Sequence, residues 1–326
     1  MNFDLTAVQA DARERGSALG REVAGAPAAD AVMRQASRAG LLERAADLLS
    51  VACAVAAVAE ESAAAGVTLA LHSGTALAIG ASRFPQLYRG ETVAAVGLSS
   101  EDIPTEEGGR LSGRAPWVAP ITTRGIAVVG PRRDGGRAAY AVALDGEGVT
   151  VETVETAGLA GLVCGHLTLR SAPCEPVGGT LPIMTRVRIL IAAAGLGIGR
   201  RALREALAAA RTAHTATSGE QTVQGLLADT ATELDAAMLM TWKAALGSPL
   251  SLADASHAKL MVTGAAQRAV ERATQVIGAD SFQRGHVIER LAQDVRALEL
   301  FAGRTEALRA AIDEGQSHAS DIVGPR

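Results

Sequence analysis

The feature that most constrains the fold is a change of sequence character that occurs twice along the chain of 326 residues. Proline is absent between Ala28 and Pro85, and apolar residues there recur at helical spacing, as in Leu41–Val55. From Thr92 to Leu169, glycine and β-branched residues form short runs separated by turn signals. After Pro182 the sequence is helical again. We therefore predict an α+β multidomain protein in which a β-domain lies between two helical blocks.

The domain boundaries follow from these changes, because a chain of this length exceeds the usual size of one hydrophobic core. Breaks near 215–219, 247–249 and 278–285 divide the last block into four long helices, which favours an antiparallel bundle. The prediction comprises an N-terminal helical domain (1–84), a middle antiparallel β-barrel domain (85–179) for which a sandwich is the alternative, a C-terminal four-helix bundle (180–315) and a frayed tail (316–326).

Charge and composition restrict the partners. Lys plus Arg is 31 and Asp plus Glu is 35, a net charge of -4, which argues against nucleic acid or anionic lipid as the main partner. The apolar windows Leu48–Ala59 and Ile189–Ile198 are too short to span a membrane, and the first residues have no secretory pattern. Cys53, Cys164 and Cys174 form no CxxC pair, which indicates a reducing compartment. We therefore expect a cytoplasmic protein without a membrane span.

Local motifs add little on their own. Gly195, Gly197 and Gly199 imitate a dinucleotide-binding turn, but their spacing differs from GxGxxG, and close helix packing explains them better. The histidines are scattered, at positions 72, 166, 214, 257, 286 and 318, so no metal site is predicted. No GxSxG motif for a serine nucleophile is present.

Five strings carry a more specific signal. They are RFPQLYRGE (83–91), GGRLSGRAPWVAPITTRGIAVVG (108–130), RILIAAAGLGIGRRAL (188–203), HAKLMVTGAAQRAVERATQVIGADSF (257–282) and ERLAQDVRALELFAGRTEALRAAI (289–312). The five strings occur in the same order as in the acyl-CoA dehydrogenase family, which the chain resembles from about Ser82 to Ala311. Members of this family are flavoproteins that oxidise the Cα–Cβ bond of acyl thioesters. The first 80 residues are similar to that family only in being helical.

The resemblance implies that FAD is the cofactor and that several residues contact it. Trp117 matches the family tryptophan that packs on the flavin ring, although the alternative that it is a core residue stays open. Ala119 stands where the family usually has Thr or Ser. Ser99 is a loose equivalent of a residue in the loop that touches flavin and substrate.

A second group of matched residues lies in the C-terminal block. Arg211 matches the arginine that holds the FAD pyrophosphate of a neighbouring subunit. Gln221 and the turn Gln275–Gly278 match further cofactor contacts. The alternative is that Arg211 is an exposed residue whose charge interacts favourably with the helix dipole.

The catalytic base is missing from both positions where the family carries it. The usual glutamate corresponds to Ala302, and the position used by some members corresponds to Val187. Glu299 lies three residues before Ala302 and hence on a similar helical face, so it is a weak candidate base. A surface ion pair is the favoured interpretation of Glu299. Arg188 is the residue that the resemblance places at the substrate.

These features give two hypotheses. In the first, the chain is the non-base subunit of a heteromeric enzyme of lipid metabolism that dehydrogenates an acyl-CoA or acyl-carrier thioester. Its partner would be a homologous base-bearing subunit, in a heterodimer or heterotetramer; a homodimer is also considered. In the second, it is a stand-alone protein of the same fold with lost or altered redox chemistry, acting as a binding scaffold or a non-dehydrogenating biosynthetic enzyme.

Overall fold

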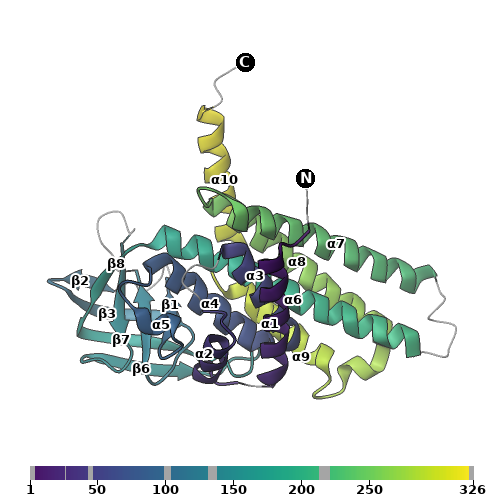
Figure 1. Ribbon diagram of the computed structural model, residues 1–326, viewed down its shortest axis with the longest axis horizontal. Coiled ribbons are helices and arrows are strands. Elements are labelled where there is room, and N and C mark those ends of the chain that lie inside the picture. Colours follow the sequence, from purple (N-terminus) through teal and green to yellow (C-terminus); the bar gives the residue numbers. More distant parts are fainter. Residues whose placement is uncertain are drawn as a thin grey trace.

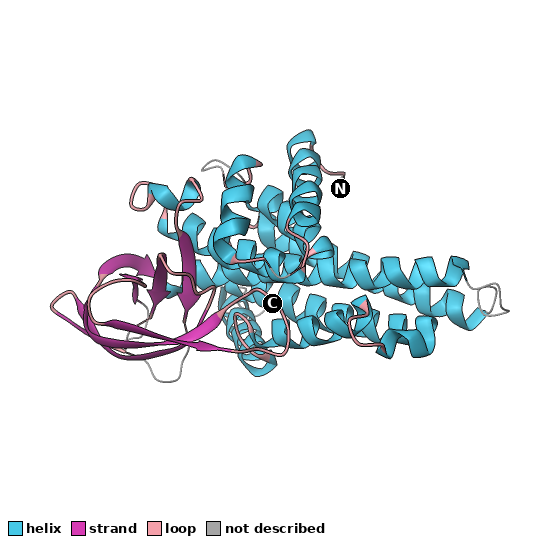
Figure 2. Cartoon of the chain, turned by 90° about the horizontal axis from the view of Figure 1, so that it is seen from below, coloured by secondary structure: helices cyan, strands magenta, loops and turns pink. Residues whose placement is uncertain are grey.

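The computed structural model describes residues 4–25, 27–42, 47–98, 104–130, 138–212 and 221–322. The strands gather at one end of the molecule, helices pack beside them, and long antiparallel helices extend to the opposite end (Figures 1 and 2). This arrangement agrees with the predicted order of a helical block, a β-domain and a helical bundle.

The N-terminal block consists of α1 (Ala7–Glu22), α2 (Ala29–Arg38), α3 (Leu48–Glu61), α4 (Ala63–Ile79) and the short α5 (Pro85–Tyr88). Side-chain caps define where several of these helices begin. Thr6 and Gln9 form a capping box at α1, Asp47 accepts the Ser50 amide at α3, and Ser62 accepts the Ala65 amide at α4. Because α3 and α4 are buried along almost their whole length, they form the core of this block.

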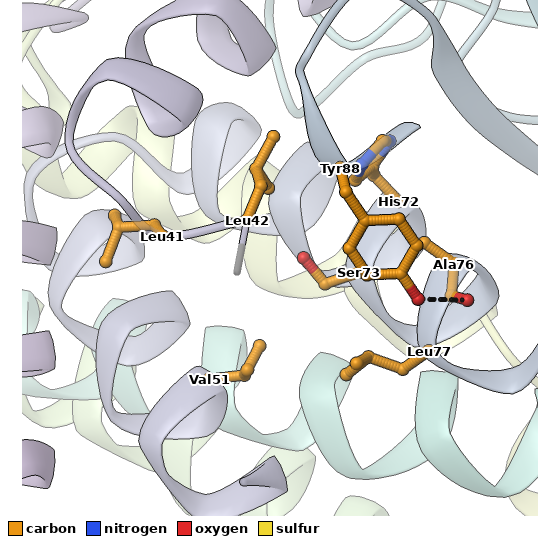
Figure 3. Close-up of a pocket in the computed structure, with 8 residues that line it drawn as sticks. All are labelled: Leu41, Leu42, Val51, His72, Ser73, Ala76, Leu77 and Tyr88. Atoms are coloured by element: carbon orange, nitrogen blue, oxygen red, sulfur yellow. Dashed lines mark hydrogen bonds between the residues drawn. The ribbon is translucent and has the colours of Figure 1, made fainter. Parts of the chain in front are cut away.

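His72 connects α4 to the elements that follow it. Its Nε2 lies 3.1 Å from the Leu87 carbonyl oxygen, and its Nδ1 accepts the Ala94 amide at 3.0 Å, so the ring is neutral with its proton on Nε2. Burial lowers the pKa of His72 to about 4. His72 and Tyr88 both line the pocket in Figure 3, and the Tyr88 hydroxyl donates to the Ala76 carbonyl at 2.8 Å.

The His72→Gln variant should be less sensitive to acid than the wild type. Between the ordinary histidine pKa of 6.5 and the folded value of about 4, the unfolded chain binds the extra proton. The stability contributed by neutral His72 is therefore present above pH 6.5 and lost as the pH falls towards 4, a loss of about 3 kcal/mol. Glutamine offers a donor and an acceptor but does not titrate. Urea unfolding at pH 7 and pH 4.5 measures the difference; equal acid losses in both proteins would contradict it.

The β-domain contains two sheets. In chain order the strands are β1 (Val93–Gly97), β2 (Thr105–Glu107), β3 (Arg110–Val118), β4 (Gly125–Val129), β5 (Ala138–Ala143), β6 (Val149–Val154), β7 (Cys164–Pro173) and β8 (Glu175–Gly179). One sheet has the order β1-β4-β5-β8 and the other β2-β3-β7-β6. Buried side chains such as Leu111, Val118 and Leu167 form a separate small core in this domain.

The sheets agree with the predicted β-domain except in one pairing. The described strands form two four-stranded sheets, which is the sandwich alternative rather than a closed barrel. One pair is not antiparallel, because β1 pairs with β4 in parallel. After β1 the chain passes through β2 and β3 of the other sheet and then returns beside β1 in the same direction, which is the long connection that a parallel pair requires.

The C-terminal block contains α6 (Thr180–Thr212), α7 (Gln221–Leu246), α8 (Leu252–Ile277), the 3₁₀ turn η2 (Gly278–Phe282), α9 (Val287–Leu300) and α10 (Thr305–Ile322). The fourth predicted helix is thus divided. α9 ends at Leu300 because Phe301 is extended, with a ψ angle of 141°. Ala302 and Gly303 follow with φ angles of 57° and 109°, so the chain between α9 and α10 is not helical. The expectation that Glu299 and Ala302 share a helical face is therefore wrong.

The three glycines of the apolar segment lie within α6, which continues through them as one helix. A Cβ atom on Gly197 would stand 2.2 Å from the Ala56 carbonyl oxygen of α3. This contact confirms close packing and excludes a dinucleotide-binding turn. Within the described residues one helix, Thr180–Arg211, is long and apolar enough to cross a membrane, but 78% of its apolar window is buried, as expected of a core helix.

Candidate functional site

The link between α9 and α10 is held by side chains from two other helices. From α6, Arg188 Nε donates to the Ala302 carbonyl at 2.9 Å, and Arg188 Nη1 donates to Ser256 Oγ at 2.7 Å. From α8, Lys259 Nζ donates to the carbonyl oxygens of Glu299 at 3.2 Å and Gly303 at 2.5 Å. We call Arg188, Ser256 and Lys259 the link clamp, because together they fix the backbone on both sides of Ala302.

The link clamp contains two buried cations. Lys259 is 1% exposed and Arg188 is 6% exposed. Burial, and secondarily the nearby Arg188 charge, lowers the pKa of Lys259 to about 7, while Glu299 opposes this change. Burial also lowers the pKa of Arg188. The four hydrogen bonds end on neutral oxygens, so the clamp depends on these acceptors to stabilise positive charge away from water.

The positions expected for a catalytic base provide no carboxylate. Ala302 is half-buried in the link and cannot accept a proton. Val187 is 1% exposed, and its backbone lies so close to α4 that a Cβ atom on Gly74 would stand 2.9 Å from Val187 Cα. Glu299 is half-buried, and its Oε1 accepts the Thr305 hydroxyl at 3.2 Å. The described contact of this carboxylate is thus a hydrogen bond across the link.

Trp117 lies on β3 with 58% of its surface exposed, so the alternative that it is a core residue is wrong. Its φ angle of 54° is unusual for a residue with a side chain. Ala119 is 1% exposed and offers no side-chain donor. Ser99 lies outside the described residues.

The remaining predicted cofactor residues lie at the far end of the bundle. Arg211 is at the end of α6, Gln221 begins α7 and Gln275 is near the end of α8; all three side chains are exposed. Gly278 has a φ angle of 76°, and a Cβ atom placed on it would meet no other atom within 4 Å, so its backbone is open to a ligand. Because α6 and α8 run away from the strands, this end is opposite the β-domain (Figure 1). One chain therefore does not bring Trp117 and Arg211 together.

Two further polar residues hold this region together without any site motif in the sequence to indicate them. Lys259 is one of only two lysines in the chain and stands among the alanines of α8. This position is the only sequence signal that could have indicated a buried lysine. Asp294 Oδ1 accepts the Leu159 amide at 2.5 Å and so attaches the β6–β7 connection to α9. Burial raises the pKa of Asp294.

A cavity of about 450 Å³ lies between the start of α2 and the β-domain, and none of the predicted site residues lines it. Its wall is apolar except for four polar side chains, Asp30, Thr122, Thr123 and Thr153.

Comparison with known proteins shows which family the C-terminal part of the chain resembles. Residues 181–316 match the family described as acyl-CoA dehydrogenase, C-terminal domain. The probable acyl-CoA dehydrogenase YngJ of Bacillus subtilis (strain 168) is 26% identical over 262 residues, which cover 69% of each chain. The 3-sulfinopropanoyl-CoA desulfinase of Paraburkholderia xenovorans (strain LB400) is 36% identical over 94 residues, which cover 28% of this chain and 24% of that protein.

Solved structures extend the similarity to the whole fold. Butyryl-CoA dehydrogenase from Megasphaera elsdenii has a TM-score of 0.83 at 18% identity, covering 97% of this chain and 100% of the other. The structure described as PigA with FAD and proline has a TM-score of 0.86 at 16% identity, covering 98% and 100%. The chain therefore has the fold of these two proteins over almost its whole length. Its resemblance to the acyl-CoA dehydrogenase family is confirmed, with the family's C-terminal domain over 181–316.

Proposed function

We propose that the protein is the non-base subunit of a heteromeric, FAD-dependent enzyme that forms the α,β double bond of an acyl-CoA or acyl-carrier thioester. The observation that carries the proposal is the intact link clamp around Ala302. Arg188 and Lys259 hold the link where the family presents its base, yet the residue presented has no proton acceptor. A homologous partner subunit then supplies the carboxylate.

The residues available fit a flavin that is shared between chains. The exposed indole of Trp117 offers an apolar wall for the ring. At the other end, Arg211 offers a guanidinium suited to a pyrophosphate, and Gln221 and Gln275 offer amide donors beside the open backbone of Gly278. Trp117 lies on β3 in the β-domain, whereas Arg211, Gln221 and Gln275 lie at the end of the bundle that is away from the strands, so a site that uses both groups needs two chains.

The chemistry assigned to this chain is binding and orientation. FAD, when bound, supplies the acceptor for the hydride that leaves Cβ of the thioester. The α-proton must go to a carboxylate held in a dry site, and neither Ala302 nor Val187 provides one. Arg188 acts on the backbone at Ala302 through its hydrogen bond and keeps the link in position.

A stand-alone protein with altered redox chemistry is the second candidate, and Ala119 favours it. The family usually has a hydroxyl at this position, whereas Ala119 is buried and has none. The chain is purified by itself and again after co-expression with a base-bearing homologue. The two preparations distinguish the two candidate functions. A yellow complex that oxidises butyryl-CoA supports the first; a chain that stays colourless in both preparations supports the second.

The Arg211→Ala variant should retain less FAD in the co-expressed complex. A charge-assisted hydrogen bond contributes about 1.5–3 kcal/mol, so we expect the dissociation constant for FAD to rise about tenfold or more. Flavin absorbance after dialysis and calorimetric titration give the value. Arg34→Ala, an exposed arginine on α2, is the matched control and should bind FAD as the wild type does. Unchanged FAD binding by Arg211→Ala would remove Arg211 from the site.

A further inference from the structure

Trp117 lies on a β-bulge between β3 and β7. In the register of these strands, Ala115 pairs with Leu167 and Val118 pairs with Gly165. Two residues of β3, Pro116 and Trp117, therefore lie opposite one residue of β7, His166. A bulge of this kind interrupts the ladder and turns a side chain to a new direction. The Trp117 amide accordingly needs an acceptor other than the facing backbone.

His166 provides this acceptor. Its Nδ1 accepts the Trp117 amide at 3.2 Å, which requires that Nδ1 carries no proton. The imidazole also meets the indole edge to face, with the ring centroids 5.3 Å apart and the planes at 80°. One side chain thus contacts both the backbone and the ring of Trp117.

The conformation of Trp117 makes these contacts necessary. A left-handed φ angle at a residue with a side chain costs about 1–3 kcal/mol and persists only where its surroundings fix it. The indole itself is 58% exposed, so core packing does not hold it. Of the contacts described for Trp117, those with His166 are the ones that oppose this strain.

We propose that His166 is a positioning residue that holds Trp117 in the left-handed conformation and so presents the indole as one wall of the flavin site. The inference rests on the proposed function for the identity of the ligand, FAD. The arrangement of His166 and Trp117 does not depend on that ligand, so the two claims can be tested separately.

The test uses two substitutions with opposite chemistry. His166→Phe keeps an aromatic edge but removes the acceptor. His166→Asn places its Oδ1 close to where Nδ1 stands, because both atoms are two bonds from Cβ. Thr168→Val, at the next outward-facing position of β7, is the matched control.

The first measurement concerns Trp117 in the full chain without flavin. In a Trp242→Phe background Trp117 is the only tryptophan, and its emission and acrylamide quenching report its environment. We expect the largest change in His166→Phe, a smaller change in His166→Asn, which keeps the acceptor but loses the ring contact, and no change in Thr168→Val. Identical spectra in all four proteins would overturn the positioning role.

The second measurement is the affinity for FAD in the complex with a base-bearing homologue. Loss of one hydrogen bond predicts a dissociation constant about tenfold higher for His166→Phe, with rescue by His166→Asn to within about threefold. If Trp117 moves in His166→Phe but FAD binds unchanged, the assignment of His166 to the flavin site is wrong. Failure of the wild-type complex to bind FAD would instead reject the proposed function, and with it this role towards the flavin.

Discussion

Replacing Arg188 with methionine should lower the free energy of unfolding by about 2–4 kcal/mol. Methionine fills much of the space of the aliphatic stem but leaves the Ala302 carbonyl and Ser256 Oγ without their donor. Each buried polar group that loses its partner costs about 1–3 kcal/mol. Loss of the Arg188 charge also relieves repulsion on Lys259, but this is a smaller cause of its lowered pKa than burial, so the net effect remains destabilising.

Two comparisons make the Arg188 experiment specific. Arg188→Lys should not restore stability, because one ammonium group cannot reproduce the fork that reaches Ala302 and Ser256. Arg186→Met, two residues earlier on α6, should cost less than about 1 kcal/mol, because Arg186 is only half-buried and donates to the nearby Pro182 carbonyl. Urea unfolding gives the values. A loss below about 0.5 kcal/mol would show that the link does not depend on the clamp.

The link clamp illustrates the limit of what can be predicted from the sequence, because it acts through contacts between distant residues. Helical periodicity and the positions of proline and glycine indicate most helices, because these signals act within a few residues. The end of α9 is different. Alanine is the best helix former, so nothing local at Ala302 predicts a left-handed residue. Its conformation is held by Arg188 and Lys259, which lie 114 and 44 residues away from their acceptors at Ala302 and Gly303.

The same distinction applies to the β-domain and to the candidate site. Short runs separated by turn signals indicate the β-domain, but the parallel pairing of β1 with β4 depends on a path through the other sheet. Family resemblance indicated Trp117. His166 is 49 residues from Trp117, and its role follows only from the register of β3 and β7. Scattered histidines in a sequence give no sign of such a contact.

The isolated chain should be unable to remove the α-proton of an acyl thioester. Ala302 and Val187 have no proton acceptor, and loss of a general base typically reduces a rate by about 10²–10⁴. Exchange of the α-protons of butyryl-CoA with deuterium oxide, followed by NMR, measures this step without an electron acceptor. We expect no exchange above the uncatalysed rate, with or without added FAD. In the complex with a base-bearing homologue, exchange and oxidation should both appear.

Glu299 provides the decisive comparison, because it is the nearest carboxylate to Ala302 along α9. The break at Ala302 turns the chain away from the helical path, and the Glu299 carboxylate bonds the Thr305 hydroxyl. Glu299→Gln should therefore change the activity of the complex by less than about twofold, because glutamine can keep this hydrogen bond. Ala302→Glu in the isolated chain should give at most weak exchange, since a base misplaced by about 1 Å loses most of its effect. Robust exchange by the unmodified chain alone, abolished by Glu299→Gln, would make Glu299 the base and reject the partner-subunit proposal.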